Sequence, residues 1–383
     1  GLDRTEIRRR NLLRPEEFPH DHQIIYQDFT ALTYDSGCYE PLLDKAKAMI
    51  GYDTFLAEEQ PRYQAAGRAV GVGVVCYVEG TGIGPFEGAR VQVQPNGKVS
   101  VATGVGTQGQ GHFTVLAQIA AEQLGVEVAD VDVVTGDTDQ FHWGTGTFAS
   151  RGAVVAGNAV NAAAAAVRGK ALRLAAEVLN VNASELEIVA GQVRVAADQE
   201  RSISLAELAS RANPMRGAVS PGSEPGLEAT DYFGPARGAT ASGAHAMILE
   251  VDRETFEIKV LKYVVVHDCG RVINPLLVAG QVQGGVAQGL GNAYYEQLVF
   301  DDNGQPTNAS FMDFLLPTAL DVPRVDIGHQ ETWAPQNALG TKGAGEAGAI
   351  PVGALFAQAL EDALGIPGLE ILEIPLKPSR VFE

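Results

Sequence analysis

Cysteine is scarce in this sequence. Cys38, Cys76 and Cys269 are the only cysteines among 383 residues, and they lie far apart. Their number is odd, and no Cys-X-X-Cys or Cys/His metal-ligand spacing is present. A secreted disulfide framework is therefore not expected, and the chain has too few cysteines for an iron–sulfur cluster of its own. We expect a protein of the reducing cytoplasm.

Basic charge and long apolar runs are lacking as well. The sequence has 28 lysines and arginines against 47 acidic residues, which gives a formal net charge of −19. This balance disfavours nucleic acid and anionic membrane surfaces as main partners. No stretch approaches the ~20 apolar residues of a membrane-spanning helix, so no membrane span is expected. The charged residues 1–12 do not form a signal peptide.

Hydrophobic patterns and turn signals predict both helices and strands. Strands are expected at 67–77, 89–94, 99–103, 131–135, 187–189, 193–195, 246–251, 257–266, 294–300 and 311–316. Helices are expected at 114–124, 152–179, 275–292 and 352–364, with capping pairs at Asp3/Glu6 and Ser204/Glu207. Residues 1–60 are predicted as short helices and loops, and 212–243 as a connector rich in Pro, Gly and Ser. The mixture is typical of an α+β fold with two mixed α/β subdomains.

Glycine is abundant, with 44 residues, and a bare loop near the end of the chain concentrates it. Residues 340–348 read GTKGAGEAG, so glycines surround the single carboxylate of Glu346. Glycine removes side chains where the backbone must pass close to something bulky. An acid on such a loop is able to lie directly against a cofactor. An ordinary glycine-rich turn would have the same sequence pattern and is the alternative.

A second glycine-rich loop, GVGTQGQGH (104–112), joins a strand to a predicted helix. Free amides and the positive dipole end at a helix N-terminus favour an anion such as phosphate. The spacing fits neither the dinucleotide fingerprint nor a Walker loop. Gln108 and Gln110 are candidates for hydrogen bonds to a heterocycle or an oxo group, and a tight structural turn is the alternative.

A third loop, residues 136–152, also leads from a strand into a helix and contains GTGTFASRG. Ser150 is predicted as the helix N-cap. Arg151 is a candidate to pair with a phosphate, with Asp137 or Asp139, or in a surface salt bridge. The set His142, Trp143 and Phe148 would suit the pocket of a flat substrate, or simply the core and its rim.

The segment DCGRVINP (268–275) precedes another glycine-rich helix, GQVQGGVAQGLGN (280–292). Cys269 alone is more often a small buried hydrophobe than a nucleophile. Asn274 before Pro275 is a natural helix cap. The remaining histidines form no metal-binding pair and are interpreted as structural or surface residues.

Taken in order, these segments resemble the molybdenum hydroxylases of the xanthine dehydrogenase/aldehyde oxidase superfamily. The resemblance lies in GQGHFTVLAQIAAEQLG (109–125), GTGTFASRG (144–152), DCGRVINP with GQVQGG (268–285), ASFMDFLLPTA (309–319) and GTKGAGEAG (340–348). It covers most of the chain from about residue 100 onward. The motifs are most similar to the bacterial branch with carbon monoxide dehydrogenase-like enzymes and N-heterocycle hydroxylases. The implied fold is the molybdenum cofactor-binding domain of this superfamily.

The resemblance also implies a domain organisation and partners. Residues 1–60 resemble the tail of a first cofactor-binding domain, and 61–383 a second one with halves at about 61–212 and 244–383. The hammerhead domain and most of the first cofactor domain are not in this sequence, as in the nicotinate dehydrogenase type, whose large subunit is split between two polypeptides. Expected partners are that N-terminal large-subunit chain, an iron–sulfur subunit with 2Fe-2S clusters, a flavin subunit with FAD, and a small-molecule substrate.

Finally, the resemblance implies roles for individual residues. Glu346 matches the general base of a hydroxylase that uses water as its oxygen source, and Gln110 lies near the metal, which is molybdenum held by the pterin with no direct protein ligand. Positions that match cofactor contacts, to molybdopterin in its cytosine dinucleotide form, are Gln108, Gly109, Gln110, Gly111, His112, Thr147, Ser150, Arg151, Cys269, Asn274, Gln281, Lys342 and Gly343. The expected substrate is an N-heteroaromatic compound. Carbon monoxide or aldehyde oxidation, a metal-free scaffold and a nicotinamide-dependent dehydrogenase are the alternatives.

Overall fold

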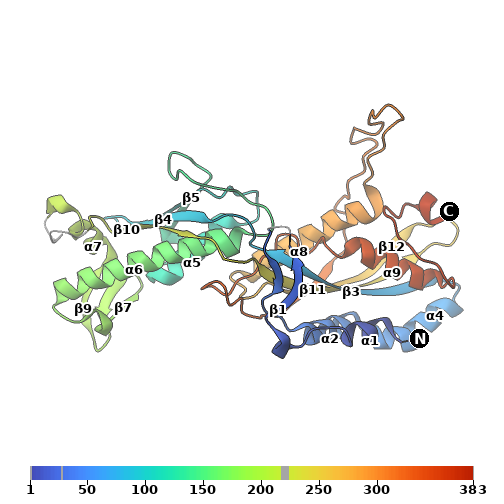
Figure 1. Cartoon of the computed structure of the whole chain (residues 1–383), viewed down its shortest axis with the longest axis horizontal. Coiled ribbons are helices and arrows are strands. Elements are labelled where there is room, and N and C mark those ends of the chain that lie inside the picture. Colours follow the sequence, from blue (N-terminus) through green and yellow to red (C-terminus); the bar gives the residue numbers. More distant parts are fainter. Residues whose placement is uncertain (1, 27–28, 217–223, 383) are drawn as a thin grey trace. The chain divides into compact units, whose positions relative to one another are not determined.

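The structure, a computed structural model, describes residues 2–26, 29–216 and 224–382, and it divides the chain into two compact units. Unit 1 contains Gly1–Gly80, Thr240–Ala334 and Lys342–Glu383, and unit 2 contains Thr81–Ala239 and Pro335–Thr341. Each unit is thus assembled from segments that are distant in the sequence (Figure 1). The two units do not test the predicted boundary at residue 60 between a first and a second cofactor-binding domain, and this boundary stays a prediction.

Unit 1 is built on a four-stranded sheet in the order β13-β12-β11-β3. Its strands are β3 (Ala69–Thr81), β11 (Ala239–Val251), β12 (Ile258–Asp268) and β13 (Val325–His329), and a separate hairpin joins β1 (His20–Ile25) to β2 (Ala31–Tyr34). Its helices are α1 (Arg4–Arg9), η1 (Pro15–Glu17), α2 (Tyr39–Ile50), α3 (Tyr52–Thr54), η2 (Phe55–Glu59), α4 (Gln60–Ala65), α8 (Pro275–Leu290), η7 (Gly291–Tyr295), α9 (Val352–Leu364) and α10 (Pro378–Phe382). β11 and β12 pair antiparallel, and β12 and β13 pair parallel.

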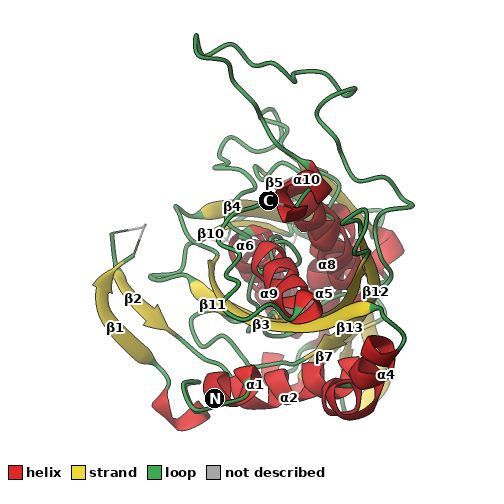
Figure 2. Ribbon diagram, turned by 90° about the vertical axis from the view of Figure 1, so that its right-hand side faces the viewer, coloured by secondary structure: helices red, strands yellow, loops and turns green. Residues whose placement is uncertain are grey.

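Alternation along the strands gives this sheet two apolar faces. Val264 and Val266 of β12 pack with the α2 side, whereas Tyr263 and Val265 pack with α8 and α9. Figure 2 shows β3 with α8 and α9 on one side and α1 and α2 on the other. A sheet that is buried on both faces explains why β12 reads as a nearly continuous Val-rich run.

Unit 2 has a four-stranded sheet in the order β10-β4-β5-β6 and a three-stranded sheet in the order β7-β8-β9. The strands are β4 (Glu87–Val93), β5 (Val99–Thr103), β6 (Val131–Thr135), β7 (Leu186–Val189), β8 (Gln192–Val195), β9 (Asp198–Ser204) and β10 (Glu228–Phe233). The helices are α5 (His112–Leu124), η3 (Val128–Asp130), the π-turn η4 (Gly152–Ala156), α6 (Gly157–Leu179), η5 (Ala183–Glu185), α7 (Leu205–Arg211) and η6 (Pro214–Arg216). α5 packs on β5 and β6, and α6 packs on β4 and β10.

The local signals for helix ends are confirmed at several positions. The Asp3 side chain accepts from the N–H groups of Thr5 and Glu6, and the Ser204 hydroxyl accepts from the N–H of Glu207. Gly125 ends α5 in the left-handed conformation, as glycine C-caps do. Within the described residues, no helix is both long and apolar enough to cross a membrane.

Several sequence-based predictions of elements are wrong. Within the described residues, no named strand forms at 294–300 or 311–316, which η7 and a long loop occupy; pairing there is limited to an isolated bridge between Phe300 and Pro306. The hairpin of β1 and β2 interrupts the predicted helices and loops of 1–60. The connector at 212–243 contains β10, which pairs with β4, and the start of β11; residues 217–223 of it lie outside the described residues. β9 and β13 were not predicted.

Candidate functional site

The glycine-rich loop before α5 presents bare backbone. Gly109 has φ +98°, and a Cβ placed there or on Gly106 would meet no heavy atom within 4 Å. Gly111 is the N-cap of α5 and provides no side-chain cap for the first helical amides. The Oε1 atom of Gln110 accepts from the Gln108 N–H at 2.6 Å, which keeps the loop in shape. The result is a stretch of open backbone that leads to a helix N-terminus.

The loop between β6 and η4 packs directly on this stretch. Gly104 and Gly144 touch backbone to backbone: a Cβ on Gly144 would lie 2.2 Å from the Gly104 carbonyl oxygen. The Thr147 hydroxyl donates to the Gly106 carbonyl at 2.5 Å. These contacts fix the two glycine-rich loops against each other, so Thr147 stabilises the loop pair in addition to its proposed cofactor role.

Arg151 is fully buried and forms an ion pair with Glu87, which is fully buried as well. Its guanidinium also donates to the carbonyl oxygens of Ile83, Pro85 and Gly146. The same carboxylate oxygen of Glu87 accepts from the backbone N–H groups of residues 145 and 146. The predicted pairing with Asp137 or Asp139, and the alternative of a surface salt bridge, are therefore wrong. Arg151 has a structural task within unit 2, since it ties the loop to the segment before β4.

Ser150 and His112 differ from what their positions in the sequence predict. Ser150 is not the helix N-cap: it has φ +48°, and Arg151 itself occupies the cap position of η4 without a side-chain cap bond. His112, the first residue of α5, is buried against Gly152, and its Nδ1 atom has no hydrogen-bond partner among the described residues. Burial lowers the pKa of His112, so the ring is neutral at physiological pH.

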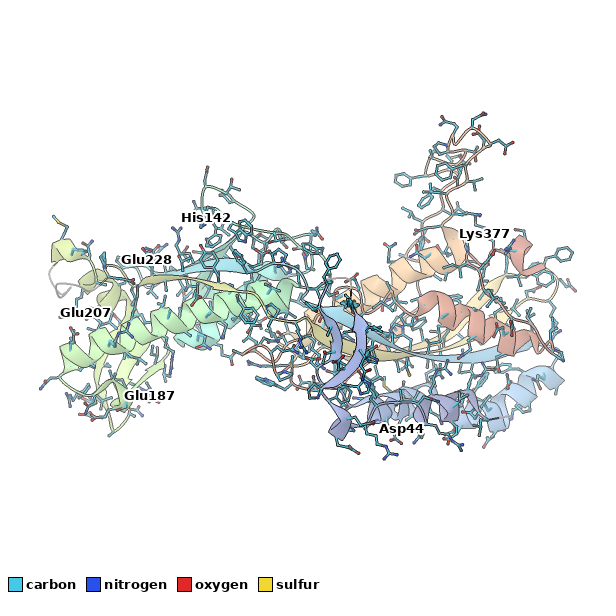
Figure 3. The ribbon with its side chains drawn as sticks, viewed as in Figure 1. Asp44, His142, Glu187, Glu207, Glu228 and Lys377 are labelled. Atoms are coloured by element: carbon cyan, nitrogen blue, oxygen red, sulfur yellow. The ribbon has the colours of Figure 1, made fainter. Side chains whose placement is uncertain are left out.

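Figure 3 labels His142, and the aromatic side chains of Phe86, Trp143 and Tyr232 gather next to it. The rings of Trp143 and Phe86 stack with centroids 5.1 Å apart, and Tyr232 meets Phe86 edge-on at 5.7 Å. His142 lies beside Tyr232, and the four side chains line a shallow cavity of about 290 Å³. Phe148 is separate from this group, since its ring lies under the Arg151 guanidinium at 4.9 Å. The predicted aromatic set is therefore split into two places.

In unit 1, Lys342 is fully buried under the loop that carries Glu346. Its Nζ donates to the Thr332 hydroxyl at 2.9 Å and to the Ser36 carbonyl at 3.2 Å, and it lies 3.7 Å from the Asp268 carboxylate. The N–H of Lys342 donates to the Cys269 carbonyl at 2.7 Å. The other Asp268 oxygen accepts from the N–H groups of Gly270 and Thr332. Lys342 thus anchors the loop at its start.

The end of the same loop is anchored on α8. A Cβ on Gly348 would lie 2.2 Å from the Val282 carbonyl oxygen, and one on Gly285 would lie 2.7 Å from the Gly348 Cα. Only glycine permits this backbone contact. Between the two anchors Gly343 is buried, whereas Glu346 is exposed at the tip. The loop is therefore fixed at both ends and presents its single carboxylate to the outside.

The remaining candidates lie around the start of α8. The Asn274 side chain accepts from the Leu277 N–H at 3.1 Å, which confirms the helix-cap interpretation. Gln281 is half-buried on α8. Cys269 is buried, and burial together with the Asp268 charge raises the pKa of its thiol to about 12, so it is no nucleophile at neutral pH. Within the described residues, no group of three His, Cys, Asp or Glu side chains could hold a metal ion.

A polar cluster that the sequence analysis missed lies beneath the Glu346 loop. His245 of β11 and His267 of β12 are fully buried, with the Tyr263 hydroxyl 3.1 Å from one ring and the Tyr77 hydroxyl 2.8 Å from the other. Burial lowers the pKa of each histidine to about 3, and the Ala347 backbone next to His245 opposes this only in part. Both rings are therefore neutral. Glu87 and Thr332 were also missed, because neither lies in a motif.

The two units contain different parts of the predicted site. Unit 2 brings together 104–112, Thr147 and Arg151, whereas unit 1 brings together Cys269, Asn274, Lys342 and Glu346. The open backbone at Gly106 and Gly109, the uncapped start of α5 and the orphaned Nδ1 of His112 fit a large polar ligand with anionic groups. A pterin with a dinucleotide tail has this chemistry.

Comparison with known proteins gives a consistent result. The family model of the molybdopterin cofactor-binding domain matches residues 45–323. The chain is 35% identical over 98% of its length to the nicotine 6-hydroxylase large subunit of Paenarthrobacter nicotinovorans, and 34% identical over its whole length to the carbon monoxide dehydrogenase large chain of Hydrogenophaga pseudoflava. It covers 46% and 48% of those chains, so it spans about half of their length.

Among solved structures, quinoline 2-oxidoreductase from Pseudomonas putida 86 superimposes with a TM-score of 0.92 at 36% identity, over 100% of this chain and 49% of that one. The fold predicted from the resemblance is therefore confirmed as the mixed α/β fold of these enzymes. The chain belongs to the molybdopterin cofactor-binding domain family, in the xanthine dehydrogenase superfamily that the sequence motifs indicated.

Proposed function

We propose that this chain is one part of the molybdopterin-binding large subunit of a molybdenum-dependent hydroxylase. The reaction would oxidise a C–H carbon of an N-heteroaromatic compound: the carbon gains a hydroxyl group whose oxygen comes from water, and two protons and two electrons are released. The observation that carries the proposal is the doubly anchored loop with Glu346 as its single exposed carboxylate. Relatives that act on nicotine and quinoline support the substrate class.

The cofactor would be held by backbone rather than by charged side chains. In unit 2 we assign this task to Gln108, Gly109, Gln110, Gly111 and His112, whose backbone leads into the open start of α5. Thr147, Ser150 and Arg151 would shape the adjoining loop, since the donors of Arg151 are directed at protein groups. In unit 1 we assign Gln281 and Gly343 to direct contact, and Cys269, Asn274 and Lys342 to the support of that contact.

The cofactor would supply the two-electron redox chemistry, and the protein would supply proton transfer and positioning. A Glu346 Oε atom would accept the proton of the attacking water. A general base needs reach before it needs a matched pKa. Reach is what the two anchors provide, because Lys342 and Gly348 leave little freedom to the residues between them.

The electrons must leave through partners, since the three free cysteines cannot hold a cluster. We propose an iron–sulfur subunit with 2Fe-2S clusters, a flavin subunit with FAD, and the polypeptide that completes the large subunit. We further propose the cytosine dinucleotide form of molybdopterin and a cytoplasmic location. Carbon monoxide oxidation is the second candidate, because carbon monoxide dehydrogenase large chains match the whole chain.

Metal and pterin analysis of the complex tests this proposal. The chain is co-expressed with its completing chain and its electron-transfer subunits, and molybdenum and the released nucleotide are quantified. Quinoline, nicotine and carbon monoxide are then offered under anaerobic conditions while reduction of the complex is followed. We expect one molybdenum per chain and reduction by a heteroaromatic compound. Reduction by carbon monoxide alone would select the second candidate, and a complex without metal would make the chain a scaffold.

A further inference from the structure

Two buried pairs of a tyrosine and a histidine lie beneath the Glu346 loop, and the proton transfer proposed above uses neither of them. His245 of β11 is paired with Tyr263 of β12, and His267 of β12 is paired with Tyr77 of β3. The pairs are neighbours, since the centroids of the Tyr77 and His245 rings are 5.7 Å apart. In both histidines the second ring nitrogen, Nε2, is buried and has no hydrogen-bond partner among the described residues. Such atoms are rare in native proteins, and a role in catalysis is one of the reasons for them.

The two histidines differ in the backbone group that lies beside each ring. Burial lowers the pKa of His245 to about 3, and the Ala347 backbone acts in the opposite direction because it favours the protonated ring. A group that favours a cation is an acceptor, so the group beside His245 is the Ala347 carbonyl oxygen. The backbone neighbour of His267 is Ser242, which lies in β11. The first pair therefore meets the loop next to Glu346, whereas the backbone neighbour of the second belongs to the sheet.

These neighbours decide which nitrogen of His245 carries the hydrogen. The ring is neutral, so one nitrogen is a donor and the other an acceptor. Nδ1 lies 3.1 Å from the Tyr263 hydroxyl, which leaves Nε2 for the Ala347 carbonyl. Because a carbonyl oxygen only accepts, Nε2 has to carry the hydrogen. Nδ1 then accepts from the Tyr263 hydroxyl, and the three groups form a chain of donors that leads from β12 to the loop.

Ala347 is the residue at which the loop turns back into the protein. Glu346 is exposed, whereas Ala347 is fully buried. The Glu346 carbonyl accepts from the Ala349 N–H at 2.9 Å, which closes a turn directly after the carboxylate-bearing residue. On the far side of Ala347, Gly348 is held against the Val282 carbonyl of α8. A donor to the Ala347 carbonyl would fix the peptide between these two points, and with it the backbone from which the Glu346 side chain projects.

We propose that His245 is a positioning residue for Glu346: its Nε2–H donates to the Ala347 carbonyl, with the Tyr263 hydroxyl holding the ring from behind. The contact is too long for a hydrogen bond in this structure, since Nε2 has no partner at that distance among the described residues. Hydrogen bonds at catalytic sites are often long outside the reacting complex and tighten within it. The inference rests on the proposed function of Glu346, because it is a general base that needs this positioning.

The tautomer is tested first, without any measurement of activity. Nitrogen NMR of the full chain with isotope-labelled histidine reports which ring nitrogen carries the hydrogen, and the variant His245→Gln identifies the resonances of His245. We expect a neutral ring with its hydrogen on Nε2 near neutral pH. A ring with its hydrogen on Nδ1, or a charged ring, would overturn the inference.

Kinetics of the complex test the role in positioning, with molybdenum quantified in every sample. His245→Phe keeps a flat ring and removes the donor, and kcat per molybdenum should fall roughly 10- to 100-fold with little change in KM. His245→Gln restores a donor and should recover most of the rate. Tyr263→Phe should lower kcat by a smaller factor. The matched control is Tyr77→Phe, which removes a hydroxyl from the second pair and should react like the wild type.

A double-mutant cycle with Glu346→Gln separates this inference from the proposed function. If His245 acts through Glu346, His245→Phe should slow the wild type but have no further effect in the Glu346→Gln background. The same loss in both backgrounds, or an equal loss in Tyr77→Phe, would make the pair structural and overturn the inference. A slow Glu346→Gln beside a wild-type rate in His245→Phe would overturn the inference alone. A wild-type rate in Glu346→Gln would overturn the proposed function, and the inference with it.

Discussion

The contact between Gly285 and Gly348 gives the sharpest test of how the Glu346 loop is held. Substitution Gly285→Ala adds one methyl group to α8, and its Cβ would lie 2.7 Å from the Gly348 Cα and 2.9 Å from the Gly348 nitrogen. The neighbouring Gly284 is the matched control, because a Cβ there meets nothing within 4 Å. Both changes replace glycine by alanine in the same helix, so their effects on helix propensity are the same, about 1 kcal/mol in favour of alanine.

The expected magnitude follows from the distances. Carbon atoms in contact prefer about 3.5–4.0 Å, so the end of the loop must move by roughly 1 Å to admit the new methyl group. The atoms that must give way are backbone, which cannot rotate aside as a flexible side chain does. Misplacement of a catalytic group by about 1 Å can slow a reaction on the order of 10²-fold. We therefore expect Gly285→Ala to lower kcat by about that factor, with a smaller change in KM.

The assay is anaerobic reduction of the complex by quinoline or nicotine, with molybdenum quantified in the same samples. Gly284→Ala should react like the wild type and unfold at a slightly higher temperature. Gly285→Ala should retain its metal and react slowly. A wild-type rate in Gly285→Ala, or the same loss in both variants, would refute the argument that this contact positions the carboxylate.

Three further predictions concern buried ionisable groups. Lys342→Met leaves a buried carboxylate without its cation and should destabilise the protein by about 3–5 kcal/mol, which a urea titration measures. Glu87→Gln should lower the unfolding midpoint with or without cofactor, because Arg151 is paired with it inside unit 2; a loss seen only in the loaded protein would instead make Arg151 a phosphate ligand. His245 and His267 have pKa values of about 3 in the folded state against about 6.5 unfolded. Between about pH 3 and pH 6.5 the unfolded chain therefore binds more protons than the folded chain. The free energy of unfolding should fall as the pH drops below about 6.5, by about 1.4 kcal/mol per pH unit for each histidine. A urea midpoint that stays constant across this range would contradict their burial as neutral rings.

Sequence reasoning was most successful where the information is local. Caps at Asp3, Ser204 and Asn274 depend on residues two or three positions apart, and all three are present. The long helices and the Val-rich strands follow from periodicity alone. The glycine-rich loops were recognised as unusual because glycine is selected wherever backbone must approach backbone, and Gly104 shows such a contact.

The failures share a physical cause, which is that the deciding partner is distant in the sequence. A phosphate, Asp137 and Asp139 were the candidate partners of Arg151, but its ion pair is with Glu87, 64 positions away and outside every motif. The partners of the Lys342 ammonium, Ser36 and Thr332, could not be found from local sequence either, and its predicted cofactor contact stays a prediction. Residues 311–316 have the composition of a strand, but a strand also needs a neighbouring strand. Within the described residues of this chain, no strand pairs with this segment.

The most direct test of the central claim is the rate of anaerobic reduction of the Glu346→Gln complex, with molybdenum quantified on the same sample. Glutamine keeps the shape of the side chain and removes the proton acceptor. General-base catalysis contributes roughly 10²–10⁴-fold, so the rate should fall by that order. The metal content should stay at the wild-type level, and Glu370→Gln, an exposed glutamate after α9, should leave both unchanged. Reduction of Glu346→Gln at the wild-type rate would contradict the account, and loss of molybdenum would make Glu346 a structural residue instead of the base.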